Sequence, residues 1–585
     1  MANKAAAANP AKEAAEKSLG MIFECLDGRK SFLLEAGAGS GKTYSLVEAL
    51  RYLIKKRGSD LARRNGKIAC ITYTNVASDE IKSRIDSHPA VVSSTIHAFC
   101  WSLIKDFQPF LKSELPNLPN WKERLDEGRG VADREIEYEL GFPSAKPEDS
   151  KISLHHDDVL AFTVRLIGQP KFRRLLVARY PVLFIDEYQD TDKDFVDALR
   201  EHFLGKVESP LIGFFGDHWQ KIYAEGSGKI EHPDLVVIEQ KANFRSVQPV
   251  VDVLNRMRPE LPQACADPDS EGVAVAFHTN DWVGTRRTGQ GGGHWTDDLP
   301  ADAAHAHLEA LRAKLEDEGW DFSADKTKIL MLTHNVLAAE QGYDKIAKVF
   351  SRNESFVKKE DRHIKFLLEV VEPVSVAYEA GRFGEMFAAL DTRTPIIRSY
   401  EQKAQWIRDM SALVDLRATG TAGDVLDHLK ATRRPRLPDA VERRERELAE
   451  WVAEAGAEEP STISRLRNLR AVPYQQVIAL SRFVDDHTPF STKHGVKGAE
   501  FENVLVVAGR GWNHYNFNQL LEWLQNPASV PADRTGFERN RNLFYVAFSR
   551  PKKRLAVLFT QRLSAVALAK LSSLFGEGNV HSFGP

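Results

Sequence analysis

The chain has 585 residues, of which 43% are apolar, and its 79 Lys and Arg nearly balance 82 Asp and Glu, for a formal net charge of −3. This length is too great for one hydrophobic core and predicts three or four domains of ~100–200 residues each. The charge excludes a generally basic nucleic-acid coat, so any contact with DNA or RNA has to come from a local groove.

The cysteines and the apolar runs bear on the compartment. Cys25, Cys70, Cys100 and Cys265 show neither paired metal-ligand spacing nor a dense disulfide framework. The sequence has no run of about 18 apolar residues that would span a bilayer, and its Ala-rich start lacks a continuous hydrophobic signal core. We therefore expect a reducing, cytoplasmic location, and we expect residues 1–18 to form a partly disordered lead or a fraying helix.

Short apolar runs that end in polar motifs recur along the chain and predict strands. The runs lie at residues 32–34, 68–71, 182–185, 211–215, 236–238, 329–332 and 504–507. Helical patterns separate most of them, which favours parallel α/β layers. Residues 284–300, which include a Gly-rich stretch, are expected to be a mobile connection or an inserted loop.

The most specific motif follows the first of these runs. Residues 36–43 read Ala-Gly-Ala-Gly-Ser-Gly-Lys-Thr, which is typical of a phosphate-binding loop between a strand and a helix. Lys42 supplies positive charge to the β- and γ-phosphates, and Thr43 offers a hydroxyl to Mg²⁺. The predicted nucleotide contacts are Gly37, Gly39, Ser40, Gly41, Lys42, Thr43 and Tyr44. Because Ala36 replaces the usual first Gly, a flexible loop of small residues is the alternative.

A pair of carboxylates follows the apolar run at 182–185. Asp186 and Glu187 stand at the C-terminal end of the predicted strand, where parallel sheets bind their ligands. Asp186 is placed to hold Mg²⁺ together with Thr43, and Glu187 is placed to orient or deprotonate the attacking water. A helix N-cap is the alternative, but the phosphate loop upstream favours catalysis. The two motifs together predict hydrolysis of a nucleoside triphosphate.

Six further segments occur in a fixed order along the chain. They are residues 72–85, 94–100, 216–223, 243–246, 492–501 and 542–550. With the phosphate loop and the carboxylates, they resemble the motifs of the UvrD/Rep/PcrA group of superfamily 1 DNA helicases, from about residue 30 to 560. This resemblance implies an α/β fold with two RecA-like lobes, each a parallel sheet flanked by helices, and inserted helical subdomains. It also implies ATP and Mg²⁺ as cofactors and 3′-to-5′ movement on DNA.

The resemblance also assigns roles at the ATP. Gln220 would sense the γ-phosphate, Phe244 would stack on the base, and Glu500 would contact the ribose. Arg245 and Arg550 would reach the γ-phosphate as arginine fingers. Because phosphoryl transfer spreads charge over the γ-phosphate oxygens, two guanidinium groups can stabilise that charge and couple hydrolysis to closure of the lobes. A buried structural pair with Asp is the alternative for each arginine.

The DNA side is assigned in the same way. The contacts that the resemblance implies are Thr72, Tyr73, Asn75, Thr95, His97, Tyr223, Thr492 and His494. Tyr73, Phe99 and Tyr223 are candidates to stack on unpaired bases, which holds single strands with little sequence preference. A core aromatic is the alternative for each of the three, and a hydrogen-bonded loop residue is the alternative for His97 and His494.

The motif positions divide the chain into lobes and inserts. The predicted first lobe is 19–102 and 171–250, with a helical insert at 103–170; the second is 251–344 and 486–585, with a helical insert at 345–485.

Three features depart from the family pattern. Residues 1–41 contain no Gln of the kind that the family uses to read adenine, so strict preference for ATP is open. Residues 224–228 read Ala-Glu-Gly-Ser-Gly where the family has aromatic-Arg-Gly-Ala, which weakens the case for base-by-base unwinding. The insert between 332 and 492 is shorter and more charged than in large repair helicases, and no nuclease-like segment follows residue 550.

The compact length and residues 184–194 are similar to the helicase-like subunits of Gabija anti-phage systems. That resemblance implies a nuclease partner of the GajA type in a hetero-oligomer, with DNA termini as the activating signal. Three functions stay open: an ATP-driven DNA translocase or helicase, a DNA-end or single-strand sensor that switches a partner nuclease, and a P-loop ATPase or kinase unrelated to nucleic acid. The third would leave the DNA-contact motifs without a purpose.

Overall fold

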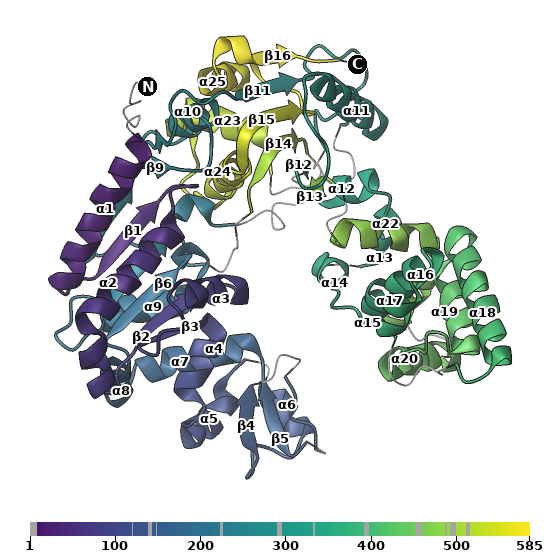
Figure 1. Ribbon diagram of the computed structural model, residues 1–585, viewed down its shortest axis with the longest axis horizontal. Coiled ribbons are helices and arrows are strands. Elements are labelled where there is room, and N and C mark those ends of the chain that lie inside the picture. Colours follow the sequence, from purple (N-terminus) through teal and green to yellow (C-terminus); the bar gives the residue numbers. More distant parts are fainter. Residues whose placement is uncertain are drawn as a thin grey trace, which may run out of the picture. The chain divides into compact units, whose positions relative to one another are not determined.

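The computed structural model of the chain describes residues 9–119, 121–138, 143–147, 149–222, 226–288, 295–331, 334–350, 352–390, 397–451, 459–485, 488–491, 499–510 and 515–584. The chain forms two compact units (Figure 1). Unit 1 comprises Met1–Val275, Gln519–Leu555 and Ala565–Val580, and unit 2 comprises Ala276–Asn518, Ala556–Ser564 and His581–Pro585.

A six-stranded sheet in the order β3-β2-β6-β7-β1-β8 organises unit 1. Its strands are β1 (Phe32–Ala36), β2 (Ile68–Thr72), β3 (Val91–Thr95), β6 (Val182–Asp186), β7 (Leu211–Gly216) and β8 (Val236–Gln240). Every neighbouring pair runs parallel. The predicted apolar runs from 32–34 to 236–238 are therefore strands, as expected. Strand β3 was not predicted, because its apolar character is limited to Val91 and Val92.

Helices cover both faces of this sheet (Figure 1). They are α1 (Pro10–Asp27), α2 (Lys42–Arg63), α3 (Asn75–Arg84), α4 (Ile96–Ile104), α7 (His156–Ile167), α8 (Pro170–Arg179) and α9 (Lys193–His202). Helix α10 (Gln248–Met257) packs instead on α24 (Thr535–Phe548) and α25 (Ala565–Phe575). Alternate strand residues point to opposite faces. Phe32 therefore packs in the core that α1 and α2 cover, and Leu33 packs in the core that contains Phe99 and Phe162 of α4 and α7.

Of the lead predicted at residues 1–18, residues 1–8 lie outside the described residues. Residues 10–18 form the first half of α1, whose N-cap Asn9 accepts a hydrogen bond from the Lys12 backbone N–H. Ala11 and Ser18 are buried. Packing of this face against the sheet stabilises the helix, which the Ala-rich composition alone does not reveal.

The segment predicted as a helical insert at 103–170 contains short helices and a small sheet. Its helices before α7 are α5 (Gln108–Glu114), η1 (Leu115–Asn117) and α6 (Trp121–Glu127), and the strands β4 (Glu135–Tyr138) and β5 (Lys151–Leu154) pair in parallel. Trp121, Ile136 and Ile152 join the same core as Phe99.

A second six-stranded sheet has the order β13-β12-β14-β15-β11-β16. Its strands are β11 (Val273–His278), β12 (Thr327–Met331), β13 (Phe490–Ser491), β14 (Phe501–Ala508), β15 (Pro551–Phe559) and β16 (Val580–Ser582). Strand β12 pairs in parallel with both β13 and β14. The helices outside the inserts are α11 (Ala301–Asp317), α23 (Phe517–Gln525), α24 (Thr535–Phe548) and α25 (Ala565–Phe575). The expected α/β fold with two RecA-like lobes is confirmed.

The described part of residues 334–485 contains helices and no strand. They are α12 (His334–Glu340), α13 (Asp344–Val349), α14 (Glu354–Val357), α15 (Arg362–Phe366), the π-helix η4 (Leu367–Val371), α16 (Glu372–Glu379), α17 (Phe383–Ala388), α18 (Tyr400–Thr419), α19 (Ala422–Thr432), α20 (Asp439–Glu450), α21 (Ser461–Arg470) and α22 (Tyr474–Val484). Arg417 of α18 is buried between Glu372 and Glu379, with nitrogen to oxygen distances of 2.8 Å. The lobe and insert boundaries drawn from the sequence stay predictions.

The Gly-rich stretch of the segment 284–300, at residues 289–294, lies outside the described residues, but residues 284–288 and 295–300 on either side of it are held to the sheet of unit 2. Arg286 Nη1 donates to the carbonyl of Thr560 at 2.9 Å, and buried Asp298 accepts from the backbone N–H of Arg510 at 2.6 Å. These two flanking stretches therefore pack at the ends of β15 and β14.

All four cysteines are buried and unpaired, in agreement with the prediction of no disulfide framework. Among the described helices, none is both long and apolar enough to cross a membrane.

Candidate active site

The phosphate-binding loop connects β1 to α2 and depends on its glycines. Gly39 and Gly41 have φ values of 72° and 81°, a left-handed conformation that side chains with a Cβ rarely adopt. A Cβ at Gly37 would lie 2.7 Å from Gln263 Nε2, and one at Gly39 would lie 2.7 Å from Arg245 Cβ. Ala36, the departure from the usual motif, is a fully buried residue of β1 and needs no glycine.

Side chains distant in sequence fix the backbone of this loop. The Ala38 carbonyl accepts from Asn243 Nδ2 at 3.2 Å and from Gln263 Nε2 at 2.9 Å. Gln240, at the end of β8, donates to the Ser40 carbonyl, and Tyr545 of α24 accepts from the Ala38 backbone N–H at 3.3 Å. Asn243 ends the short strand β9 (Ala242–Asn243), and Gln263 directly precedes β10 (Ala264–Cys265), with which β9 pairs.

The loop also carries a buried hydroxyl that matches a phosphate. Ser40 Oγ has no hydrogen-bond partner within the described part of the chain. Buried polar atoms are nearly always hydrogen-bonded, so an unpaired hydroxyl beside a helix N-terminus favours an anionic ligand there. Thr43, in the first turn of α2, is half-buried, and Tyr44 is 55% exposed.

The structure brings Lys42 together with both predicted carboxylates. Asp186 ends β6, and Glu187 follows with a φ of 49°, a left-handed conformation that is rare for a residue with a side chain. Lys42 Nζ lies 2.8 Å from Glu187 Oε1. Gln189 Nε2 donates to Glu187 Oε2 at 2.5 Å and holds this carboxylate from the other side. Backbone strain of this kind clusters at functional sites.

Electrostatics indicate that the carboxylates can hold a cation. Burial, aided by the charge of Glu187, raises the pKa of Asp186 to about 7. Burial opposes the charge of Lys42, but Glu187 and Asp186 outweigh it and raise the pKa of Lys42. Asp186 Oδ1 is buried with no hydrogen-bond partner among the described residues. An oxygen donor in this position, with the Thr43 hydroxyl, fits Mg²⁺.

The predicted γ-phosphate sensors lie in one hydrogen-bonded group. Arg550 is buried and donates from Nη2 to Gln220 Oε1 at 3.2 Å. Arg245 Nη1 donates to the Ser549 carbonyl at 2.9 Å, on the residue before Arg550. Burial, followed by the charge of Arg245, lowers the pKa of Arg550 to about 9. Two guanidinium groups so close together favour a multiply charged anion such as a γ-phosphate.

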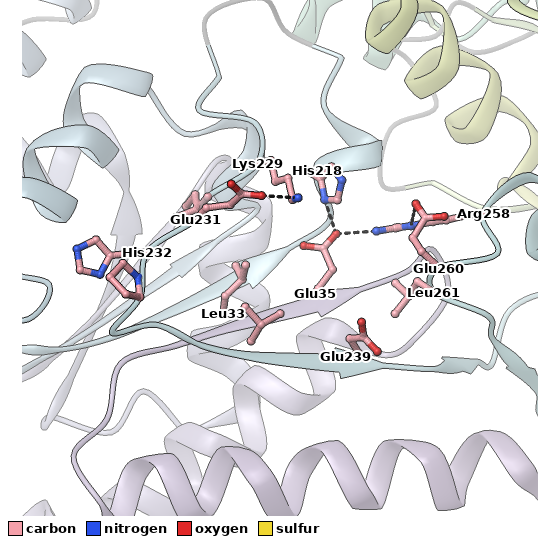
Figure 2. A pocket seen from close by; sticks show the side chains of 13 residues that line it. Leu33, Glu35, His218, Lys229, Glu231, His232, Glu239, Arg258, Glu260 and Leu261 are labelled. Atoms are coloured by element: carbon pink, nitrogen blue, oxygen red, sulfur yellow. Dashed lines mark hydrogen bonds and ion pairs between the residues drawn. The ribbon is translucent and has the colours of Figure 1, made fainter. Parts of the chain in front are cut away.

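An ion-pair network lies behind these sensors and was not predicted from the sequence (Figure 2). Arg258, which is 2% exposed, contacts Glu35 Oε1 and Asp217 Oδ1, each at 2.7 Å. Glu35 also accepts from Tyr188 OH at 2.7 Å and lies 2.7 Å from His218 Nδ1. Burial opposes ionisation of Glu35, but His218 and Arg258 outweigh it and lower its pKa to about 2.

This network borders a cavity of about 640 Å³ that is also lined by Leu33, Lys229 and Glu231 (Figure 2). Glu35, Asp217 and His218 could in principle hold a metal ion, but Arg258 already occupies both carboxylates. In the sequence, this network is indicated by Glu35, which is a charged residue within the otherwise apolar strand β1.

The predicted base-stacking residue is exposed beside the phosphate loop. Phe244 is 45% exposed, and its backbone N–H donates to the Gly39 carbonyl at 2.8 Å. Its ring lies 3.5 Å from the position that a Cβ on Gly41 would occupy. The exposed part of the ring is therefore near the start of α2. Glu500 is exposed directly before β14 in unit 2.

The candidate DNA contacts divide into exposed and buried residues. Tyr73, which is 42% exposed, and Asn75 lie on the surface between β2 and α3. Thr72 is buried and donates from Oγ1 to the Thr74 carbonyl at 3.0 Å, so it shapes this loop rather than presenting its side chain to a strand. Thr95 is half-buried at the N-terminus of α4. Phe99 is 1% exposed, so of the two alternatives for this residue the structure supports the core aromatic and not stacking on bases.

His97 is half-buried beside two other histidines. Its ring lies 4.8 Å from the ring of His156, which in turn lies 5.3 Å from that of His155. Burial and the neighbouring His156 lower the pKa of His97 to about 4, so it is neutral at pH 7. Of the remaining predicted DNA contacts, Tyr223, Thr492 and His494 lie outside the described residues.

The described end of the segment that departs from the family pattern packs on the carboxylate loop. Ser227 donates from its backbone N–H to the Thr191 carbonyl at 2.8 Å and from Oγ to the Tyr188 carbonyl at 2.6 Å. A Cβ on Gly226 would collide with the Gln189 carbonyl. Gly226 and Ser227 therefore allow close contact with the loop that follows Glu187, whereas Ala224 and Glu225, which depart from the family pattern, lie outside the described residues.

Comparisons with known proteins agree with these motifs. Residues 22–128 and 133–231 match the family model of the UvrD/REP helicase N-terminal domain. The chain is 23% identical to Gabija protein GajB of Bacillus cereus (strain HuB5-5), over 97% of this chain and 98% of that protein. It is 24% identical to the ATP-dependent DNA helicase PcrA of Bacillus subtilis (strain 168), over 43% of this chain and 41% of PcrA. It is also 24% identical to a probable DNA helicase II homolog of Mycoplasma capricolum subsp. capricolum (strain California kid / ATCC 27343 / NCTC 10154), over 38% of each chain.

Proposed function

We propose that this UvrD-like chain is an ATP-dependent DNA translocase or helicase that couples hydrolysis of Mg·ATP to 3′-to-5′ movement on single-stranded DNA. The observation that carries the proposal is the meeting of Lys42, Glu187 and Asp186 at the end of the phosphate loop. The alternative of a flexible loop of small residues would not place a lysine and two carboxylates from another strand together. The match to the UvrD/REP domain supports DNA as the nucleic acid that the chain binds and ATP as the nucleotide that it hydrolyses.

The residues of the site suggest separate tasks. The loop N–H groups, the Ser40 hydroxyl and Lys42 hold the β- and γ-phosphates, while Arg550 and Arg245 stabilise the charge that develops on the γ-phosphate. Asp186 and Thr43 would hold Mg²⁺, which neutralises phosphate charge when bound.

Glu187 is the proposed general base. In the structure, its carboxylate is paired with Lys42 at 2.8 Å. A bound γ-phosphate would compete for Lys42 and release Glu187, which then orients or deprotonates the attacking water. Nucleotide binding thereby releases the general base that hydrolysis of the nucleotide requires.

The DNA side rests on exposed residues next to the ATP site. Tyr73 and Asn75 follow β2, the strand adjacent to β6 and its catalytic carboxylate. An exposed aromatic can stack on an unpaired base, and this interaction is tolerant of sequence. The loop after β2 is therefore proposed as part of the path of single-stranded DNA.

Steady-state ATP hydrolysis with and without single-stranded DNA tests the proposal. We expect DNA to stimulate hydrolysis, and Lys42→Ala to reduce it by at least about 100-fold without a change in fold, because phosphate charge is lost. Glu187→Gln should bind nucleotide with the affinity of the wild-type chain yet fail to turn it over. Equal loss of nucleotide binding in both variants would contradict the separate roles. Strand displacement on 5′-tailed duplexes alone would contradict the 3′-to-5′ direction.

A second candidate function is a DNA-end or single-strand sensor in anti-phage defence, in which ATP hydrolysis activates a partner nuclease with little unwinding. Two observations favour it. The similarity to Gabija protein GajB extends along nearly the whole chain, and the sequence has Ala224 and Glu225 where the unwinding helicases have an aromatic residue and Arg. The proposed partner is a GajA-type nuclease in a hetero-oligomer. DNA-stimulated hydrolysis without strand displacement, together with co-purification of such a nuclease from native cells, would favour the sensor over the motor.

A further inference from the structure

Arg258 joins the two strands that carry the opposite sides of the active site. It follows α10 directly, and its Nη2 contacts Glu35 of β1 at 2.7 Å (Figure 2). Its Nη1 contacts Asp217, also at 2.7 Å. Glu35 precedes the phosphate loop, and Asp217 directly follows β7. One buried side chain therefore links the strand of the phosphate loop to the segment that carries Gln220.

The contacts continue from Asp217 to both catalytic groups. Asp217 Oδ2 accepts from Gln220 Nε2 at 2.8 Å, and Gln220 Oε1 accepts from Arg550 Nη2 at 3.2 Å. The backbone N–H of Asp217 donates to Gln189 Oε1 at 3.0 Å, and Gln189 in turn donates to Glu187. The orientation of Asp217 thus bears on the sensor and arginine finger at one end and on the general base at the other.

Stability alone does not account for a guanidinium in this place. A buried ion pair gains little over well-packed apolar residues of the same volume, because desolvation of the charges offsets their attraction. The rings of Trp219 and Tyr545 lie 5.1 and 5.8 Å from the Arg258 guanidinium and would suit an apolar side chain as well. A planar guanidinium, however, can hold two carboxylates at a fixed separation, which neither an apolar residue nor the point charge of Lys can do.

We propose that Arg258 is a positioning residue for ATP hydrolysis. It holds the Asp217 carboxylate in the orientation that directs Gln220, and through it Arg550, at the γ-phosphate. Because Glu35 anchors the other end of the guanidinium, the sensor group is aligned with the strand that leads into the phosphate loop. This inference rests on the ATP hydrolysis proposed above.

The first test compares Arg258→Lys with the wild-type full-length chain. Lysine keeps the charge but cannot bridge both carboxylates, so we expect kcat for ATP to fall by about 10- to 100-fold, as a small misplacement of catalytic groups does. The dissociation constant for ADP should change by less than about 3-fold, because Arg258 does not touch the phosphate loop. The same titration gives the number of ADP sites per chain, and we expect this number to stay at the wild-type value. A loss of folded protein would instead lower kcat and the number of ADP sites in proportion.

Arg417→Lys is the matched control. Arg417 is also buried between two carboxylates at 2.8 Å, but it lies in the helices of unit 2. We expect it to lower Tm as Arg258→Lys does and to leave kcat unchanged. An equal fall in kcat in both variants, or a normal kcat in Arg258→Lys, would overturn the inference while leaving the proposed ATP hydrolysis in place. A wild-type chain without hydrolysis would instead overturn the proposed function.

A double-mutant cycle tests whether Arg258 acts through Gln220. In a Gln220→Ala background, Arg258→Lys should reduce kcat by less than about 2-fold, because the group that it positions is gone. Independent, additive effects would contradict the proposed route. If Arg258→Lys does not fold, Glu35→Gln serves in its place, since it loosens the other anchor of the same guanidinium. The expected result is again a fall in kcat, by about 3- to 10-fold, with unchanged ADP affinity, and a normal kcat would overturn the inference.

Discussion

Replacement of Gln263 by Ala should loosen the phosphate loop. Gln263 is buried, and its Nε2 donates to the Ala38 carbonyl at 2.9 Å and to the Ala242 carbonyl at 2.7 Å. The loss of two buried hydrogen bonds costs about 1–3 kcal/mol in total. If nucleotide binding has to restore the ordered conformation of the phosphate loop, the affinity of the chain for nucleotide falls by about 5- to 150-fold.

The assay is a fluorescence titration with ADP alongside a thermal melt. Gln476→Ala is the matched control, because Gln476 also makes two hydrogen bonds to a segment distant in sequence. At the N-terminus of α13 in unit 2, it accepts from the Lys345 N–H at 2.8 Å and donates to Asp344 Oδ1 at 3.0 Å. We expect similar melting shifts in both variants but weaker ADP binding only in Gln263→Ala. Wild-type affinity in Gln263→Ala would refute the reasoning, and equal weakening in both variants would show general destabilisation instead.

Three further outcomes are expected. Because burial, aided by the neighbouring His156, lowers the pKa of His97 to about 4, the folded chain binds fewer protons than the unfolded chain between about pH 4 and 6.5. The free energy of unfolding should therefore fall on acidification from pH 7 to 5, by about 1 kcal/mol because solvent screens this half-buried ring; urea titrations of His97→Gln should show a shallower fall, and an identical slope would contradict this. Phe99→Ala should cost about 3–5 kcal/mol of stability without altering the DNA affinity of the folded chain, whereas Tyr73→Ala should keep its Tm and lose about 1–3 kcal/mol of single-strand affinity by fluorescence anisotropy; the opposite pattern would return the stacking role to Phe99. Gly39→Ala should weaken ADP binding, because a φ of 72° costs an L-residue about 1–2 kcal/mol, while Gly384→Ala, where a Cβ meets nothing within 4 Å, should bind ADP normally.

The sequence by itself determined those parts of the site whose functional groups come from neighbouring residues. Residues 36–43 and the pair Asp186 and Glu187 could be recognised because one loop and one strand end supply their groups, and spacing alone expresses this. The central strands could be predicted because strands buried on both faces are apolar throughout. Strand β3 lacked that signal, since polar residues follow its first two valines.

Only the tertiary structure decided which of the candidate aromatic residues are exposed enough to stack on a base. Tyr73 and Phe99 are both aromatic residues of motifs that follow a strand, but Phe99 lies on the buried face of α4 and Tyr73 on a surface loop. Burial depends on what packs against a helix from elsewhere in the chain, and for Phe99 this includes Tyr180, whose ring lies 5.2 Å away.

The support of the site also comes from the tertiary structure. Gln263 and Arg258 reach partners 225 and 223 residues earlier in the chain, Ala38 and Glu35. A hydrogen bond to a backbone carbonyl leaves no pattern in the sequence, because every residue offers the same acceptor. The local sequence therefore determined which groups perform the chemistry, while long-range packing decided which side chains hold them in place.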